Sequence, residues 1–289
     1  MDPLAHLPAP GRARVLVSDL DHPEGVAYDS VADVLWAGGE AGQIYRVSVE
    51  DRRAEEVARA PGFVLGLAVD GRGRLALCVS SDGSLCAYDG EVVQRIAAGL
   101  TFPNYPAFGP DGTLYVSDSG SWGGGDGRLV RVDADGTAET FSHAAPNFTN
   151  GCAVSPDGRW LWVVESYVPV LSRFDLASGE REEVRRFPGT VLDGIAFTAD
   201  GGLLVSCYRP DRIYYMHASG DVDVVAQDPQ GTMLAAPTNV CFVGAGLDRV
   251  VSANLGRWHL TLLDLGLIGA PLHRPERWAL DAVAVEVRS

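Results

Sequence analysis

Five oxygen-bearing side chains recur at matching places along the chain and could together bind a divalent metal ion. They are Glu24, Asn104, Asn150, Asp193 and Asn239. Each stands immediately before or within a short apolar segment, where a buried carboxylate or carboxamide is costly unless it is satisfied. Oxygen ligands of this kind suit Ca²⁺ or Mg²⁺ rather than zinc or copper. Four protein oxygens would leave positions for water and substrate, because Ca²⁺ takes about six to eight ligands.

The alternative is that these side chains only cap strand ends through local hydrogen bonds. That explanation is favoured for any one of them taken alone. Four such residues in register on separate segments favour the metal instead.

Six similar segments recur at a period of about 40 to 45 residues and would bring these side chains together. They begin near residues 24, 65, 105, 150, 193 and 238. Each runs from an apolar strand through a tight turn to a second strand, a polar loop and a third strand. This pattern predicts an all-β fold, a six-bladed β-propeller with four-stranded antiparallel blades around a central channel. Equivalent positions of all blades would then meet at one axis.

Turn residues and the two ends of the chain complete this prediction. The pairs Asp70-Gly71, Asp111-Gly112, Asp157-Gly158 and Asp200-Gly201 favour hairpins that need positive φ. Residues 14–17 and 278–287 each read as a strand, and either could complete the blade begun by the other terminus. Closure matters because an exposed sheet edge invites aggregation. The glycine-rich segment 120–127 reads either as a solvated loop or, through Trp122, as a rim over the central site.

Composition sets the class of protein. The net charge of −15 argues against nucleic acid and anionic membrane surfaces as partners, although solubility alone could explain it. No linker interrupts the repeat, so we expect one domain over residues 1–289. We expect its partner to be a small-molecule substrate. We expect the protein to be a monomer or a weak homo-oligomer. We see neither a signal peptide nor an apolar run long enough to span a bilayer. We expect the five cysteines to be buried free thiols and do not expect a Cys78–Cys86 disulfide. Free thiols are typical of a reducing compartment, so we expect a cytoplasmic protein.

Four short motifs carry a resemblance to a known family. They are Pro-Glu-Gly-Val at residues 23–26, Phe-Pro-Asn-Tyr at 102–105, Thr-Asn-Gly-Cys-Ala-Val-Ser at 149–155 and Leu-Asp-Gly-Ile at 192–195. In this order, and roughly one blade apart, they resemble the signatures of the SMP-30/gluconolactonase/LRE-like family over about residues 12 to 287. The resemblance implies a six-bladed propeller with a divalent metal at its centre. It implies metal ligands at Glu24, Asn150 and Asp193, with Asn104 as a fourth ligand or a substrate contact.

One departure from the family pattern bears on the substrate. The sugar lactonases of the family carry an arginine two residues before this asparagine and an aspartate after it, where Phe102 and Tyr105 stand here. Loss of the arginine removes a natural clamp for hydroxyl-rich or anionic substrates. We therefore expect a less polar ligand. Its expected contacts are Phe102, Asn104, Tyr105, Trp122, Tyr167 and Tyr208, and Phe148 and Trp258 are further aromatic residues of the mouth loops.

These observations predict a divalent-metal-dependent hydrolase of the lactonase or esterase type. Ca²⁺ is the expected ion, with Zn²⁺, Mg²⁺ and Mn²⁺ left open. Asp193 is the expected catalytic residue, a carboxylate that touches the metal and takes the proton of the attacking water. Asp118 and Glu165 are second-choice bases for which a strand-end hydrogen bond is the favoured explanation. His22, two residues before Glu24, could orient a ligand or act as an acid.

Two other functions stay open on the sequence. The same metal could serve a cyclisation or isomerisation of an aromatic or hydrophobic metabolite, which the aromatic replacements motivate. The propeller could also be a non-catalytic platform for a ligand or protein, because fold alone does not give function. In that case alanine at Glu24 or Asp193 should leave binding intact.

Overall fold

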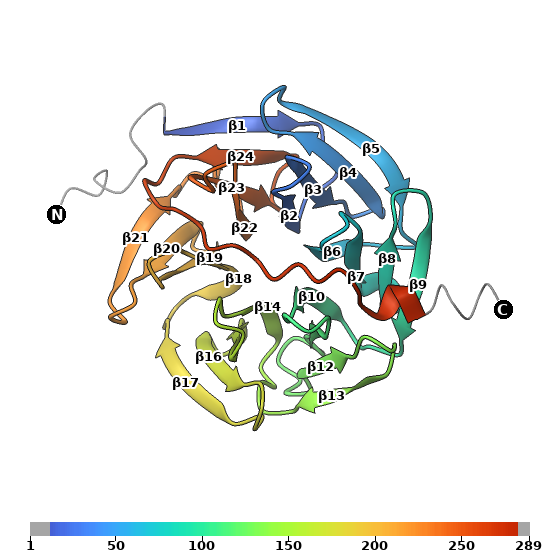
Figure 1. Ribbon diagram of the computed structural model, residues 1–289. Helices are drawn as coiled ribbons and strands as arrows, with labels where there is room; N and C mark the ends of the chain where they lie inside the picture. The colour runs from blue at the N-terminus through green and yellow to red at the C-terminus, as the bar shows by residue number, and fades with distance from the viewer. Residues whose placement is uncertain (1–11, 283–289) are drawn as a thin grey trace.

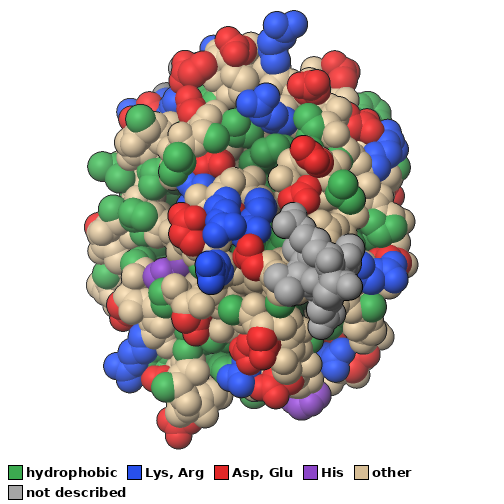
Figure 2. Space-filling model, turned by 45° about the vertical axis from the view of Figure 1, so that its right-hand side comes forward, with side chains coloured by type: hydrophobic (Ala, Val, Ile, Leu, Met, Phe, Trp, Pro, Cys, Tyr) green, Lys and Arg blue, Asp and Glu red, His purple; other side chains and the backbone are tan. Residues whose placement is uncertain are grey.

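The structure is a computed structural model that describes residues 12–282. Six four-stranded antiparallel sheets surround a central axis, which confirms the predicted propeller (Figure 1). Figure 2 shows acidic and basic side chains interspersed over the face that it views. Among the described residues, no helix has the length and apolar character needed to cross a membrane. The expectation that residues 1–289 form one domain stays a prediction.

Each blade runs from an inner strand at the axis to an outer strand at the rim. The first blade contains β2 (Val26–Asp29), β3 (Val34–Gly38), β4 (Gln43–Ser48) and β5 (Arg53–Arg59). The second contains β6 (Val64–Val69), β7 (Leu75–Val79), β8 (Ser84–Tyr88) and β9 (Val93–Ala98), with a 3₁₀ turn at Ser80–Asp82. The third contains β10 (Pro103–Phe108), β11 (Leu114–Asp118), β12 (Arg128–Val132) and β13 (Ala138–Ser142).

The second half of the ring repeats this plan. The fourth blade contains β14 (Thr149–Val154), β15 (Trp160–Glu165), β16 (Val170–Asp175) and β17 (Arg181–Arg186). The fifth contains β18 (Val191–Phe197), β19 (Leu203–Arg209), β20 (Arg212–Met216) and β21 (Val222–Gln227). The sixth contains β22 (Pro237–Val243), β23 (Arg249–Asn254), β24 (His259–Leu263) and, from the other end of the chain, β1 (Ala13–Ser18).

Burial decreases from the axis to the rim, and the sequence of each strand follows it. Every residue of β22 is buried, whereas β17, with the sequence Arg-Glu-Glu-Val-Arg-Arg, has no buried residue. The inner strands pack between neighbouring blades and need apolar side chains on both faces. The outer strands carry charged side chains, which discourage edge-to-edge pairing with other chains.

The N-terminal strand closes the ring. Strand β1 pairs antiparallel with β24, so the first strand of the chain completes the last blade, as one of the two predicted arrangements requires. The other half of that prediction is wrong within the described residues. Trp278 is followed by a helical turn at residues 279–282 rather than by a strand. Residues 283–287 of the predicted strand lie outside the described part of the chain.

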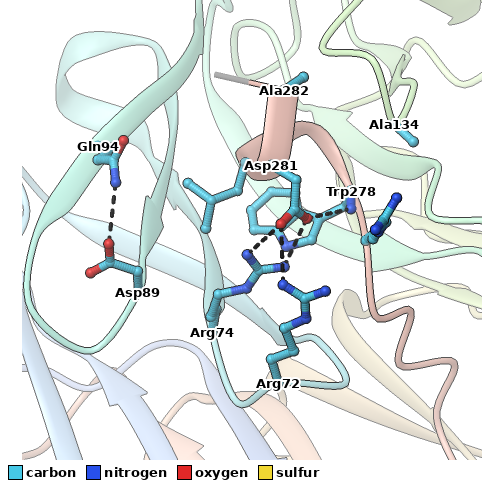
Figure 3. Close-up of a pocket in the computed structure, with 10 residues that line it drawn as sticks. Arg72, Arg74, Asp89, Gln94, Ala134, Trp278, Asp281 and Ala282 are labelled. Carbon is cyan, nitrogen blue, oxygen red and sulfur yellow. Dashed lines mark hydrogen bonds and ion pairs between the residues drawn. The ribbon is translucent and has the colours of Figure 1, made fainter. Parts of the chain in front are cut away.

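The reason for this difference is that the C-terminal segment is anchored across the axis instead of along a sheet edge (Figure 1). Trp278 is fully buried, packs against Phe108 with ring centroids 5.2 Å apart, and donates its indole N–H to Asp70 Oδ2 at 2.9 Å. Figure 3 shows Asp281 accepting hydrogen bonds from Arg74 at 2.9 and 3.0 Å beside this tryptophan. Because the Trp278 indole is buried and bonded to Asp70, this part of the chain cannot also lie along the exposed edge of a sheet.

The same segment covers the ends of the inner strands. Ala270 N–H donates to the Phe197 carbonyl at 2.9 Å, and the Arg274 guanidinium donates to Asp29 Oδ1 at 2.6 Å. These contacts reach the fifth and first blades, at the end of the channel where the inner strands finish. The opposite end, where the inner strands begin, carries the candidate site.

The predicted tight turns are present with one shift. Positive φ occurs at Gly112, Gly158 and Gly201, as expected. In the turn after β6 the left-handed residue is Gly73 rather than Gly71, because Asp70 accepts hydrogen bonds from the backbone N–H of Arg72 and Arg74 and widens the turn. All five cysteines are buried and free, as predicted.

Replacement of Trp278 by alanine should destabilise the protein, because it empties a fully buried site and leaves Asp70 without the indole donor. We expect the free energy of unfolding to fall by about 3 to 5 kcal/mol. Urea unfolding followed by circular dichroism measures it. Val31→Ala is the control, since Val31 is 84% exposed, and should change stability by about 0.5 kcal/mol or less. Equal losses in the two variants would contradict the anchoring role.

Candidate metal centre

The five predicted oxygen donors lie at the starts of the inner strands, at one end of the channel. Glu24 lies two residues before the start of β2, and the others belong to inner strands of the third, fourth, fifth and sixth blades: Asn104, Asn150, Asp193 and Asn239. All five are at most 5% exposed. The second blade has Leu65 at the equivalent position, and a Cβ on the following Gly66 would lie 2.5 Å from the Tyr105 ring. The glycine thus makes room for a side chain of the next blade.

Irregular pairing directs these side chains toward the axis. The register of the inner strand against its neighbour shifts at the polar residue in each of four blades: between Pro103 and Tyr105, Thr149 and Cys152, Leu192 and Ile195, and Pro237 and Val240. A β-bulge re-aims a side chain that regular pairing would place between two blades. The polar residues therefore leave the apolar layer and face the channel.

Glycines beside the donors let neighbouring inner strands come very close. A Cβ on Gly151 would lie 2.4 Å from the Asp193 carbonyl oxygen. A Cβ on Gly194 would lie 2.3 Å from Asn239 Oδ1. No residue with a side chain fits such gaps, which explains why glycine follows Asn150 and Asp193.

Three donor oxygens in this group have no hydrogen-bond partner among the described residues. They are Asn104 Oδ1, Asn150 Oδ1 and Asp193 Oδ1. Leaving a buried acceptor unpaired costs about 1 to 3 kcal/mol, so three at one place need an explanation. Strand-end capping fails for these atoms, because a capping oxygen would have a backbone N–H donor.

The partners of the neighbouring groups orient these oxygens. Asn150 donates its amide to Ser166 Oγ at 3.0 Å, and Ser166 in turn donates to the Leu192 carbonyl at 2.6 Å. With its nitrogen engaged, Asn150 keeps its oxygen free. Asn239 donates to Glu24 Oε2 at 3.3 Å and to the Glu24 carbonyl at 3.1 Å, so it positions the glutamate rather than offering an orphaned oxygen.

The two carboxyl groups are held in an environment that disfavours their charge. Burial raises the pKa of Glu24 to about 8, opposed by the Asn239 hydrogen bond. Burial also raises the pKa of Asp193 well above its usual range, and the nearby Glu24 charge raises it further. A divalent cation would reverse both effects, because it neutralises two carboxylates and satisfies the unpaired oxygens together. The donor set therefore suits a hard cation that prefers oxygen ligands. Its members are Glu24, Asn104, Asn150 and Asp193.

A second cluster has metal-binding residue types but a different role. Asp21, His22 and Glu40 lie close enough to share an ion. However, the Trp258 indole N–H donates to His22 Nε2 at 3.1 Å, and an indole can only donate. The neutral imidazole must then carry its proton on Nδ1, which lies 3.1 Å from Asp21 Oδ1 and 3.0 Å from Glu40 Oε2. This is a hydrogen-bonded cluster, since a metal on Nδ1 would set two N–H donors against each other.

The second-choice bases are engaged elsewhere. Asp118 accepts backbone N–H bonds from Thr101 and Phe102 at 2.9 and 2.7 Å and pairs with Arg128 at 2.9 Å. Glu165 accepts the Asn147 N–H at 2.9 Å and pairs with Arg181 at 2.6 Å. Both carboxylates hold loops at the mouth, as the strand-end explanation predicts.

An aromatic cluster lines the mouth on the side of the third and fourth blades. Trp122 lies 5.0 Å from Phe148 and 5.4 Å from Tyr167, and Phe102 lies 5.7 Å from Phe148, measured between ring centroids. Three of these were expected as substrate contacts. Phe148 joins them in the left-handed backbone region, with φ of 60°, which no sequence pattern announces.

The other two predicted aromatic contacts lie apart from this cluster. Tyr105 lines the channel on the inner side of the donors. Tyr208 is half-buried beneath the Arg209 guanidinium, 4.7 Å from its ring centroid. Sequence reasoning also missed Ser166, whose role as the partner of Asn150 depends on a loop geometry that the sequence does not reveal.

Comparison with known proteins identifies the family. The model of the SMP-30/gluconolactonase/LRE-like region matches residues 22–253, which contain all five donors. The chain belongs to this family.

Two solved structures share the fold. A calcium-binding protein, regucalcin, from Agrobacterium tumefaciens superposes with a TM-score of 0.76 at 17% identity, covering 92% of this chain and 97% of that one. A gluconolactonase from Xanthomonas campestris superposes with a TM-score of 0.75 at 19% identity, covering 91% and 93%. A curated relative, strictosidine synthase-like 4 of Arabidopsis thaliana, is 27% identical over 206 residues. The match covers 63% of this chain and about half, 55%, of that protein.

The raised pKa of Glu24 predicts how stability depends on pH without metal. The folded state binds a proton more tightly than the unfolded chain, so the stabilising contribution is full below about pH 4.5 and is lost as pH rises through about 8. After chelation, the melting temperature should therefore decrease as the pH rises from about 4.5 to about 8. Excess Ca²⁺ should raise the melting temperature more at pH 8 than at pH 5.5.

Thermal unfolding of wild type and Glu24→Gln, with and without chelator, measures this effect. The glutamine keeps the shape of the side chain and cannot titrate, so the fall should be smaller in that variant. A pH profile identical to that of wild type would show that other groups cause it.

Proposed function

We propose that the protein is a divalent-metal-dependent hydrolase of the lactonase or esterase type that acts on a small lactone or ester without strong sugar character. The observation that carries this proposal is the set of unpartnered buried oxygens beside two carboxyl groups, at a mouth with an aromatic wall. Membership of the gluconolactonase-like family supports a lactonase-type reaction in general.

Glu24, Asn104, Asn150 and Asp193 would hold the ion, for which Ca²⁺ is the first choice because every donor is an oxygen. A bound divalent cation supplies Lewis-acid polarisation of a carbonyl oxygen and lowers the pKa of water. Asn239 fixes the Glu24 carboxylate through two hydrogen bonds, and Ser166 fixes the Asn150 carboxamide. These contacts hold the donors in place before any ligand arrives.

Asp193 is our candidate general base. Its carboxylate makes no hydrogen bond within the described residues, so one oxygen could bind the ion while the other accepts a proton. It would accept the proton of the attacking water and return it to the leaving alkoxide oxygen. Glu24 suits this role less well, because Asn239 already engages its carboxylate.

The aromatic wall defines the proposed substrate. Phe102 stands where the family's sugar lactonases place an arginine, and it contacts Phe148 rather than a polar group. Trp122 and Tyr167 are 55% and 50% exposed and offer apolar surface beside the site. An aryl or alkyl group beside the ester carbonyl would exclude water from this apolar surface, whereas a polyol would leave the surface hydrated.

A non-hydrolytic reaction on an aromatic metabolite is the second candidate. The same aromatic wall favours it, as does the similarity to a protein named for a synthase. Failure to hydrolyse any ester or lactone, together with tight metal binding, would move this candidate to the front.

Hydrolysis of dihydrocoumarin and phenyl acetate, with glucono-1,5-lactone for comparison, tests the first proposal. We expect turnover of the aryl substrates that chelation abolishes and Ca²⁺ restores. Asp193→Ala should lower kcat by more than about 10⁴-fold, to the level of the chelated wild type, because it removes both a metal ligand and the candidate base. Asp135→Ala is the control, because Asp135 is an exposed carboxylate in the turn between β12 and β13, away from the loops of the mouth, and accepts a bond from the Thr137 N–H.

The substrate claim has its own variant. Trp122→Ala should raise KM for the aryl substrates about tenfold, a loss of about 1.4 kcal/mol, and leave KM for gluconolactone unchanged. A preference for gluconolactone in wild type would contradict the proposed substrate class. Aryl ester hydrolysis that survives both chelation and Asp193→Ala would contradict the mechanism.

A further inference from the structure

The channel contains a cavity on the inner side of the metal donors, away from the mouth. Its volume is about 340 Å³, and it is lined by the middle residues of all six inner strands and by part of the C-terminal segment, residues 270–274. None of the five donor residues lines it. Its wall thus shares no residue with the proposed metal centre, although Tyr105 and Val240 directly follow two of the donors.

The lining is predominantly apolar. Typical wall residues are Val26, Leu67, Val154, Ile195 and Phe242. Ala68 and Ala153 also belong to the wall and are only half-buried, although inner strands are otherwise buried almost throughout. Small side chains at these two places keep the space open. A cavity of this size and composition is typical of sites for small apolar molecules.

The polar groups around the cavity are engaged, with one exception. The Arg274 guanidinium is paired with Asp29 at 2.6 Å, and His273 contacts the Ser155 carbonyl at 2.8 Å. The Tyr28 hydroxyl donates to Asp33 at 2.5 Å. The Tyr105 hydroxyl makes no hydrogen bond with any residue between 12 and 282, while its ring forms part of the wall. A ligand would thus meet hydrocarbon, the thiols of Cys152 and Cys241, and a single free hydroxyl.

The cavity meets the surface at the C-terminal segment, beside Leu272. This segment is fixed on one side by the bonds from Gly269 and Ala270 to the Leu247 and Phe197 carbonyls, both backbone contacts of 2.8 to 2.9 Å. On the other side Arg274 is held by Asp29 and Asp70. Between these anchors Leu272 is 56% exposed and forms part of the cavity wall, so an apolar side chain stands at the entrance.

We propose that this inner cavity is a second small-molecule site, which binds a neutral, apolar compound carrying one hydrogen-bonding group that pairs with the Tyr105 hydroxyl. Charge excludes an ionic ligand from the depth of the cavity. Among residues 12–282, the one arginine of the wall, Arg274, is paired with Asp29, and no carboxylate lines the wall to meet a cation. A neutral compound loses little on desolvation and gains the apolar contact. This inference is independent of whether the donors hold a metal.

The neutral dye N-phenyl-1-naphthylamine is a suitable probe, because its fluorescence rises in apolar surroundings. We expect saturable binding of one dye per protein. Ala153→Phe and Ala68→Phe each place a phenyl group in the cavity, and each should weaken binding at least tenfold. Two filling variants from different blades are used so that one that fails to fold does not decide the outcome, and thermal unfolding identifies the folded ones.

Two further variants separate this cavity from the aromatic cluster at the mouth and test its hydroxyl. Trp122→Ala should leave dye binding unchanged. In displacement of the dye, 2-naphthol should compete about two- to tenfold better than naphthalene in wild type, and Tyr105→Phe should remove that preference. Undiminished binding in a folded filling variant, or loss of binding in Trp122→Ala, would overturn the proposal. An unchanged naphthol preference in Tyr105→Phe would overturn the assigned role of the hydroxyl.

Discussion

The candidate site depends on one electrostatic constraint, the burial of two carboxyl groups and several carboxamides where no cationic side chain of residues 12–282 reaches them. Burial raises the pKa of both Glu24 and Asp193, and the three unpaired oxygens add to the cost. Elsewhere the protein handles buried acids differently. Asp118, Glu165 and Asp70 each have an arginine partner. The absence of such a partner at the axis, within the described residues, is what distinguishes a binding site from a structural ion pair.

The rest of the propeller can be understood as support for this arrangement. Bulges in the inner strands turn the donors toward the axis, and the glycines beside them admit the neighbouring backbone. Ring closure by β1 and β24 keeps the blades in place, so donors from five blades stay together. The C-terminal segment covers the far end of the channel, which leaves the two ends chemically different: oxygen donors at one, and apolar side chains at the other.

The sequence predicted the ring and the places of the polar residues at the starts of its inner strands, because each leaves a local signal. The repeat period, the turns and the polar residue at the start of each inner strand are such signals. The C-terminal segment left a misleading one, since alternating apolar residues near Trp278 resemble a strand until its indole is seen to bond Asp70. Tyr105 was assigned to the mouth, and only the bulge beside Asn104 shows that its ring lies in the channel.

Contacts between distant parts of the chain were beyond sequence reasoning. The bond from Ser166 to the Leu192 carbonyl and the bond from Trp258 to His22 depend on how loops of different blades meet. The second of these decides between a metal site and a hydrogen-bonded cluster at Asp21, His22 and Glu40. Residue types alone favour metal binding there, and the direction of one N–H bond excludes it.

Calorimetric titration of Ca²⁺ into chelated wild type, Asp193→Ala and Asp21→Ala tests the central claim most directly. We expect one ion per wild-type protein, no measurable binding in Asp193→Ala, and retained binding in Asp21→Ala. Absence of binding in wild type, or binding that is lost in Asp21→Ala and kept in Asp193→Ala, would contradict it.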